Sequence, residues 1–469
     1  MEFDLIVQGG ELVSPEGSVV ADVGVADGRV RAVGDLDARG AAETYDASGL
    51  LVFPGFIDEH VHSREPGLEY KEDFSHSTRA AAAGGITTVV EMPNSVPPVS
   101  DAASFRSRAA LLGRSAHVDF ALWGIVLGDA NTADLAALAE AGVVGFKLFW
   151  GYALDKRTLA LVYDPAPGQE VVPPPDDGQI LEAFEAIAAT GRPVAIHAEN
   201  AEVIARLTRR QRGSGSLDYA ALLRSRPAYA EAMTIDAGIR LAAETGVHLH
   251  VLHVSSGDGA ERIAQARERG ARVTAETCPH YLFLSQEDYP RLGTAMKVFP
   301  PIREASHRER LWKALTAGAI QTLGSDHAPH TKEEKAAELW RAPAGAAVVQ
   351  ATVPLLLGAV NDGRLSVHDV AALLSENPAR LLGLYGRKGV IAPGADADLT
   401  IVDMDRPWTI RRDAMLSKSS VMPYDGVSGR GSPVASFLRG RQLMQDGELM
   451  GGGGASGQLV TPTRAPSLR

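Results

Sequence analysis

The pattern of hydrophobic and polar positions divides this chain of 469 residues into three segments. Residues 1–53 carry short alternating stretches separated by turns, and Asp27-Gly28 between two of them favours a β-hairpin. Residues 54–388 carry apolar runs that alternate with amphipathic, helix-like stretches. Residues 389–469 return to short strand-like stretches and end in a glycine-rich tail from Gly451, which we expect from its composition to be flexible.

The middle segment contains eight strand-like runs with helix-like stretches between most of them. The runs are 56–61, 87–92, 118–124, 143–149, 192–197, 248–254, 272–277 and 320–326. Repeated strand-then-helix units predict an α/β fold, a (β/α)8 barrel of the TIM type, whose catalytic residues lie at the carboxyl ends of the strands. Because residues 1–53 hold too few apolar side chains for a core of their own, we expect them to form one small β-sandwich domain with residues 389–469.

Two connections in the middle segment are long. Residues 151–178 are rich in proline and follow the fourth run, and residues 326–350 follow the eighth. Both leave strands on the face where a barrel keeps its active site, so a lid or specificity loop is one interpretation of each. The other interpretation is that each is a surface loop without a functional role.

Composition narrows the kind of partner. The net charge is −12, with acidic and basic residues intermixed, which disfavours nucleic acid and anionic membranes. The single cysteine, Cys278, excludes an internal disulfide and fits a reducing cytoplasm. The acidic N-terminus lacks the features of a signal peptide, and no apolar run approaches the ~18 residues of a membrane span. We therefore expect a cytoplasmic protein that acts on a small molecule.

Ionisable side chains occur within the apolar runs or at their ends. His60 and His62 lie on one face of the first run, with a single residue between them. The others are Lys147, His197, His253 and Asp326, whereas His248 and His250 open their run and are interpreted as structural. Neutral imidazoles suit zinc, and a buried lysine is rare unless it is paired or modified. The four histidines and the aspartate therefore predict a metal site at one end of the barrel.

The motifs around these residues resemble those of the amidohydrolase superfamily, specifically the cyclic amidohydrolases: dihydroorotases, hydantoinases, dihydropyrimidinases and allantoinases. They are Asp58-Glu-His-Val-His, Gly145-Phe-Lys147, His197-Ala-Glu-Asn, His253-Val-Ser-Ser, Glu276-Thr-Cys-Pro-His and Gly324-Ser-Asp-His-Ala-Pro-His330. The resemblance implies that His60, His62 and Asp326 hold the more buried of two Zn²⁺ ions, with Mn²⁺ or Co²⁺ as alternatives. It implies that His197 and His253 hold the other ion and that Lys147, as N6-carboxylysine, bridges the two. It also implies that Asp326 transfers the proton during ring opening, and that the protein is a homo-oligomer, a tetramer or a dimer.

The resemblance leaves the substrate open. Arg64, Asn94 and His330 match dihydroorotase positions that grip a carboxylate, so dihydroorotate, opened to N-carbamoyl-aspartate, is the leading hypothesis. Tyr152 matches a substrate-contacting tyrosine of hydantoinases, which favours a neutral ring as the alternative: a hydantoinase, dihydropyrimidinase or allantoinase activity. Of these, allantoinase fits the resemblance less well, because allantoinases tend to carry asparagine at the position of Arg64 and one more residue before Asn94. With a neutral ring as the substrate, Arg64 would be incidental, for example in a rim salt bridge with Glu65 or Glu69.

Two further points bear on the function. Phe299 is bulkier than the small residue that the resemblance leads us to expect at its position. A non-catalytic scaffold relative is a third hypothesis, but such relatives lose metal ligands, and here all six ligand positions are filled.

Overall fold

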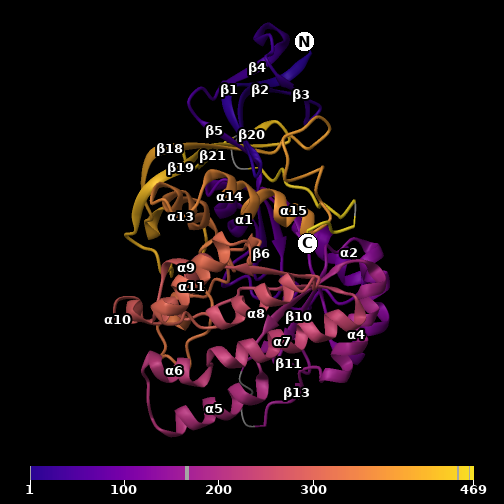
Figure 1. The fold of residues 1–469 in the computed structure, drawn as a ribbon, viewed down its shortest axis with the longest axis vertical. Helices are drawn as coiled ribbons and strands as arrows, with labels where there is room; N and C mark the ends of the chain where they lie inside the picture. The colour runs from indigo at the N-terminus through magenta and orange to yellow at the C-terminus, as the bar shows by residue number, and fades with distance from the viewer. Residues whose placement is uncertain (1, 164–167, 451–453, 464, 469) are drawn as a thin grey trace.

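The computed structural model describes residues 2–163, 168–450, 454–463 and 465–468. It consists of a (β/α)8 barrel and a β-sandwich domain to which both ends of the chain contribute (Figure 1). In Figure 1 the indigo strands from the N-terminus and the yellow strands from the C-terminal region lie together above the barrel. Among the described residues, no helix is long and apolar enough to cross a membrane.

The barrel has eight parallel strand positions. They are β6 (Phe56–Val61), β7 (Ile86–Glu91), β8 (Asp119–Leu122) continued by β9 (Gly124–Ile125), β10 (Phe146–Trp150), β14 (Pro193–Ala198), β15 (His248–Val251), β16 (Val273–Thr277) and β17 (Thr322–Leu323). Neighbouring strands pair in this order, and a parallel bridge between Val61 and His327 closes the ring. Each of the eight expected runs overlaps one of these positions, with ends that differ by up to three residues.

Helices surround the barrel or extend its loops. They are α1 (Phe74–Ala83), α2 (Ala102–Leu112), α3 (Leu135–Ala141), α4 (Asp177–Thr190), α5 (Ala201–Gly213), α6 (Tyr219–Ser225), α7 (Ala228–Thr245), α8 (Gly257–Glu268), α9 (Pro279–Phe283), α10 (Tyr289–Leu292), α11 (Ala305–Thr316), α12 (Lys332–Lys335), α13 (Val349–Asn361), α14 (Val367–Ala371) and α15 (Asn377–Leu381). Side-chain caps fix several starts: Asp73 accepts from the N–H of His76 at α1, and Asp176 forms a capping box at α4.

The β-sandwich domain is one nine-stranded sheet. Its strands are β1 (Phe3–Ser14), β2 (Gly17–Ala26), β3 (Arg29–Gly34), β4 (Ala41–Asp46), β5 (Leu51–Pro54), β18 (Leu399–Thr409), β19 (Ser428–Leu438), β20 (Arg441–Gln445) and β21 (Glu448–Leu449). Asp27 and Gly28 both have left-handed backbone, with φ of 52° and 73°, at the expected hairpin between β2 and β3. β5 pairs antiparallel with β18, and this pairing joins the two ends of the chain in one core.

The tail expected to be flexible runs from Gly451 to Gly457; residues 451–453 lie outside the described residues, and the chain from Gly457 onward contacts the barrel. The carbonyl of Gln458 accepts from the N–H of Phe120, and Val460 donates to the carbonyl of Phe120, so the tail extends the edge of β8. Gly457 is required by a close approach, because a Cβ there would lie 1.9 Å from the Val118 carbonyl oxygen. Composition suggests flexibility, but it cannot show that the tail binds to a strand that is distant in the sequence.

The connection after β10 forms a small antiparallel sheet of β11 (Ala153–Asp155), β12 (Leu161–Val162) and β13 (Val171–Val172). It stands over the carboxyl end of the barrel and brings Tyr163 to the pocket described below. The connection after β17 brings Ala344 and Gly345 to the same pocket. Both long connections therefore form part of the pocket wall.

Candidate active site

A cavity opens at the carboxyl ends of the barrel strands. All six candidate ligands line it: His60, His62, Lys147, His197, His253 and Asp326. The remaining lining residues are Arg64, Phe149, Tyr152, Tyr163, Phe299, Ala328, Ala344 and Gly345. The folded chain thus brings together side chains from positions 60 to 345.

His60, His62 and Asp326 converge on one point. Asp326 Oδ1 lies 3.3 Å from His60 Nε2 and 3.4 Å from His62 Nε2. Two ligands of a tetrahedral zinc ion with bonds of about 2.0–2.1 Å are separated by about 3.4 Å. Burial opposes ionisation of Asp326, but the two histidines hold its pKa well below the ordinary value. The three side chains therefore present donor atoms in their metal-binding protonation states.

His197 and His253 form the second pair. His197 Nδ1 lies 3.0 Å from His253 Nε2, and His197 Nε2 lies 2.9 Å from Glu199 Oε2. Because a carboxylate only accepts, Nε2 of His197 donates, which leaves the Nδ1 lone pair directed at His253. Burial lowers the pKa of both histidines, so they are neutral.

Lys147 lies in β10, fully buried, and its Nζ has no hydrogen-bond partner among the described residues. Burial lowers its pKa to about 7, so a large fraction of the amine is neutral near neutral pH. A neutral amine is the form that can react with CO₂ to give a carbamate. A buried amine without a hydrogen-bond partner, beside two groups of candidate ligands, fits a lysine that carries CO₂ as a carbamate.

Three pocket residues other than glycine hold left-handed backbone: Arg64 (φ 66°), His253 (φ 39°) and Asp326 (φ 49°). His253 lies two residues beyond β15, and Asp326 lies three beyond β17, so neither belongs to a strand as its run suggested. Such backbone costs energy at residues with a Cβ and clusters at functional sites. The turn it produces points both side chains into the pocket.

A buried polar network lies beneath His60. Glu276 Oε1 accepts from His60 Nδ1 at 2.9 Å and from the backbone N–H of His253 at 3.0 Å. Glu59 lies 3.4 Å from His250 Nε2, and His250 Nδ1 lies 2.9 Å from the Thr274 hydroxyl. This network supports the ligands from inside the barrel. His250 belongs to it and therefore has a structural role, as the sequence suggested.

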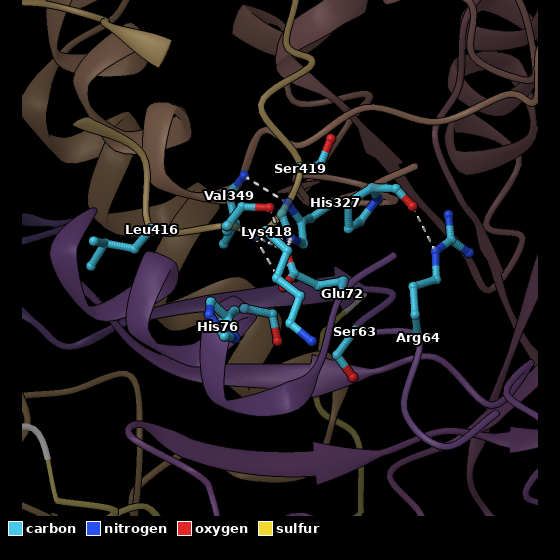
Figure 2. Close-up of polar contacts among 12 residues, drawn as sticks. Ser63, Arg64, Glu72, His76, His327, Val349, Leu416, Lys418 and Ser419 are labelled. Carbon is cyan, nitrogen blue, oxygen red and sulfur yellow. Dashed lines mark hydrogen bonds and ion pairs between the residues drawn. The ribbon is translucent and has the colours of Figure 1, made fainter. Parts of the chain in front are cut away.

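His327, next to Asp326, is held from two sides (Figure 2). Its Nδ1 accepts from the backbone N–H groups of 348–349 at the start of α13, so its Nε2 carries the proton and faces Glu72 at 3.7 Å. The Glu72 carboxylate also accepts from the N–H of Lys418, in the segment between β18 and β19. The β-sandwich domain is thereby connected to the backbone that carries Asp326.

The three residues expected to grip a carboxylate are not equally available. Asn94 Oδ1 lies 2.7 Å from His62 Nδ1, so Asn94 orients a metal-ligand candidate. His330 Nε2 lies 2.9 Å from the Ala344 carbonyl, and its Nδ1 accepts from Lys71 at 3.1 Å. Of the three, Arg64 alone lines the pocket.

Arg64 pairs with neither Glu65 nor Glu69. Its Nε donates to the Pro329 carbonyl at 3.1 Å, and an Nη lies 3.2 Å from His330. In the part of the chain that the structure describes, no carboxylate pairs with it; Glu65 accepts from the N–H of Phe74, and Glu69 accepts from the N–H of Gly67. The Arg64 guanidinium is thus a positive charge at the pocket, held by neutral groups.

Aromatic side chains form the rest of the wall. Tyr152 packs against His197 and Tyr163, with ring centroids 4.6 and 4.7 Å away, and Tyr163 lies 6.1 Å from Phe299. Sequence reasoning singled out Tyr152 and Phe299 but missed Phe149, Tyr163 and Glu199. Glu199 could have been found, because it lies two residues after His197 and so on the same face.

These features define a barrel hydrolase with a candidate metal site, of the kind that opens cyclic amides. The chain belongs to the amidohydrolase family, whose model matches residues 51–443.

Relatives carry three different substrate names. An allantoinase from Rubrobacter xylanophilus is 43% identical over 100% of this chain and 99% of its own length. An L-hydantoinase (dihydropyrimidinase) from Arthrobacter aurescens has a solved structure that superposes with a TM-score of 0.91, at 36% identity over 98% of this chain and 100% of that one. A dihydroorotase from Methanothermobacter thermautotrophicus is 34% identical over 93% of this chain and 94% of its own length. These names support the expected group of cyclic amidohydrolases without choosing a substrate.

Proposed function

We propose that this protein is a di-zinc hydrolase that opens a five-membered cyclic ureide, with allantoin as the first substrate to test. The observation that carries this choice is that Asn94 and His330, which a carboxylate grip needs, already hold His62 and Ala344. The full-length similarity to an allantoinase and an L-hydantoinase supports a hydantoin-type ring.

Each residue of the site has a role in this reaction. His60, His62 and Asp326 would hold one ion, His197 and His253 the other, and carboxylated Lys147 would bridge them; Mn²⁺ or Co²⁺ could replace Zn²⁺. Bound there, the ions would lower the pKa of a water molecule and polarise the ring carbonyl. Asp326 takes the proton of the attacking water and passes it to the leaving ring nitrogen. Tyr152, Tyr163 and Phe299 hold the flat ring against this centre.

Dihydroorotate is the second candidate, and Arg64 is the observation that favours it. Its guanidinium lies at the pocket without a carboxylate partner among the described residues, and it could pair with a ring carboxylate. Arg64 alone, however, would have to supply the recognition that three residues were expected to share.

The test is a side-by-side assay of purified protein loaded with Zn²⁺ and bicarbonate. Allantoin, a 5-substituted hydantoin, dihydrouracil and dihydroorotate are compared by kcat/KM. We expect allantoin or the hydantoin to lead. A clear preference for dihydroorotate would overturn the neutral-ring proposal, and no turnover of any ring by metal-loaded protein would favour a non-catalytic scaffold.

We also propose that the protein is a cytoplasmic homo-oligomer, a tetramer or a dimer. Its single, buried cysteine supports a reducing compartment. Light scattering of the purified chain measures the number of subunits.

A further inference from the structure

Arg226 links the two halves of the pocket, although no motif indicated it. It follows α6, and only 5% of its surface is exposed. One Nη donates to the Glu199 carboxylate and lies 3.2 Å from the Tyr152 hydroxyl. Its guanidinium carbon lies 3.5 Å from the centroid of the Phe299 ring. One cation therefore contacts a carboxylate on the metal side and an aromatic face on the substrate side.

On the metal side, Arg226 pairs with Glu199. Both side chains are buried, and Glu199 Oε2 accepts from Arg226, from the Tyr152 hydroxyl at 2.9 Å and from His197 Nε2 at 2.9 Å. Because His197 Nε2 donates to this carboxylate, the Nδ1 lone pair stays free to bind an ion beside His253. Removing the Arg226 guanidinium would leave the buried Glu199 carboxylate without its ion-pair partner.

On the substrate side, Arg226 fixes the plane of Phe299. Stacking restrains both partners: the ring limits movement of the guanidinium, and the guanidinium limits movement of the ring. The backbone of Arg226 is anchored in turn, because its carbonyl accepts from Arg303 at 2.8 Å. Motion of the Phe299 ring therefore changes the position of the side chain that supports Glu199.

We propose that Arg226 is a positioning residue that couples the aromatic wall at Phe299 to the metal-binding tautomer of His197. This inference rests on the proposed metal centre. It deepens the proposed function, because a ring bound against Phe299 stabilises the same arrangement that retains the ion at His197 and His253. By linkage, that ion strengthens ring binding to the same degree.

The test measures retention of the second ion by competition with a chromophoric chelator, with metal content determined in parallel. We expect Glu199→Gln and Arg226→Lys each to weaken the second ion about 10–100-fold while the first is retained. Lysine keeps the charge but loses the forked donors and the flat face. Phe299→Leu should weaken retention of the second ion about fivefold, although Phe299 supplies no ligand. The same substitution should have no further effect in the Arg226→Lys background.

Arg380→Lys is the matched control. Arg380 also stacks on a ring, Tyr385 at 3.6 Å, and pairs with a carboxylate, Glu376 at 2.7 Å, but it lies in α15 and does not line the pocket. Thermal unfolding verifies that each variant is folded. Additive effects of Phe299→Leu and Arg226→Lys, or an Arg226→Lys protein that retains its ion as tightly as Arg380→Lys, would overturn the coupling.

The chelator measurement needs no substrate. If no ring is opened but the second ion weakens as expected, the proposed function fails and the role of Arg226 stands. If rings are opened and retention of the second ion is unchanged by the substitutions at Arg226 and Phe299, the proposed function stands and the role of Arg226 fails. A wild-type protein that retains no ion after loading overturns both.

Discussion

Glu276 and His60 are joined by a hydrogen bond of 2.9 Å between Oε1 and Nδ1, across 216 residues of sequence. Both side chains are buried, and a carboxylate facing an imidazole fixes which ring nitrogen carries the proton. His60 Nε2 is left unprotonated and directed at Asp326. A residue of β16 that supplies no predicted ligand thereby sets the orientation of one that does.

Glu276→Gln tests this relationship. Glutamine keeps the size of the side chain but can turn an amide N–H instead of an accepting oxygen toward His60 Nδ1, so we expect retention of the ion at His60, His62 and Asp326 to weaken by about tenfold. Chelator competition measures the change. Glu376→Gln, which alters a carboxylate paired with Arg380 away from the pocket, serves as the control. Equal retention in both variants would show that Glu276 does not orient His60.

Lys147→Ala tests the bridging carboxylate. The variant should lose both ions and at least about 10³-fold in kcat, because it removes the group that joins the two ligand sets. Short carboxylic acids such as acetate or propionate should restore part of the activity by occupying the space of the missing side chain. Full activity in the unsupplemented variant would contradict the role of Lys147.

The fold could be predicted from the sequence because the periodicity of strands and helices follows short-range rules. Strand periodicity located eight barrel positions; His60, Lys147 and His197 lie within them, and His62 lies one residue beyond β6. The partners of the ligands could not be predicted, since Glu276 and Arg226 reach the site through pairings across more than 25 residues. Asn94 and His330 show the limit of motif matching: the residues are present, but their neighbours determine what they bind.

Arg64→Met separates the two candidate substrates. If a ring carboxylate is the ligand of Arg64, kcat/KM for dihydroorotate should fall about 100-fold, because a charge-assisted contact is lost. Hydrolysis of allantoin or a hydantoin should change by less than about threefold. Asn94→Ala is the comparison, since it acts through His62 and should slow every ring by a similar factor. A loss confined to dihydroorotate in Asn94→Ala would restore the expected carboxylate role of Asn94.

Lys388 connects the barrel to the β-sandwich domain. Its Nζ lies 2.6 Å from Asp119, which begins β8, and 3.0 Å from Asp396, and it also pairs with Asp398 just before β18. Lys388→Met would leave these buried carboxylates without their shared cation, so we expect the free energy of unfolding to fall by about 3–5 kcal/mol. Urea unfolding at neutral pH measures it.

The pH dependence of this contribution has a definite sign. Burial opposes the charge of Lys388, but Asp398, Asp119 and Asp396 raise its pKa above the ordinary 10.5. A raised pKa means that the stabilisation is fully present below about pH 10.5 and is lost as the pH rises further. The stability difference between wild type and Lys388→Met should therefore be constant from neutral pH up to about pH 10.5 and shrink above it. A difference that already shrinks between neutral pH and about pH 10 would place the contribution elsewhere.

The docked tail provides the last prediction. Val460 is fully buried, Leu468 is 8% exposed, and both belong to the hydrophobic cluster that contains Ile57 and Trp123. Burial of two such side chains contributes about 3–6 kcal/mol, so a chain that ends at Gly457 should unfold at a markedly lower temperature. It should also show red-shifted tryptophan fluorescence if Trp123 becomes hydrated. Because no described tail residue lines the pocket, KM and kcat of the folded protein should be unchanged at low temperature. Val460→Ala should produce a smaller loss in the same direction, and a truncated protein with unchanged melting temperature would show that the tail contributes no stability.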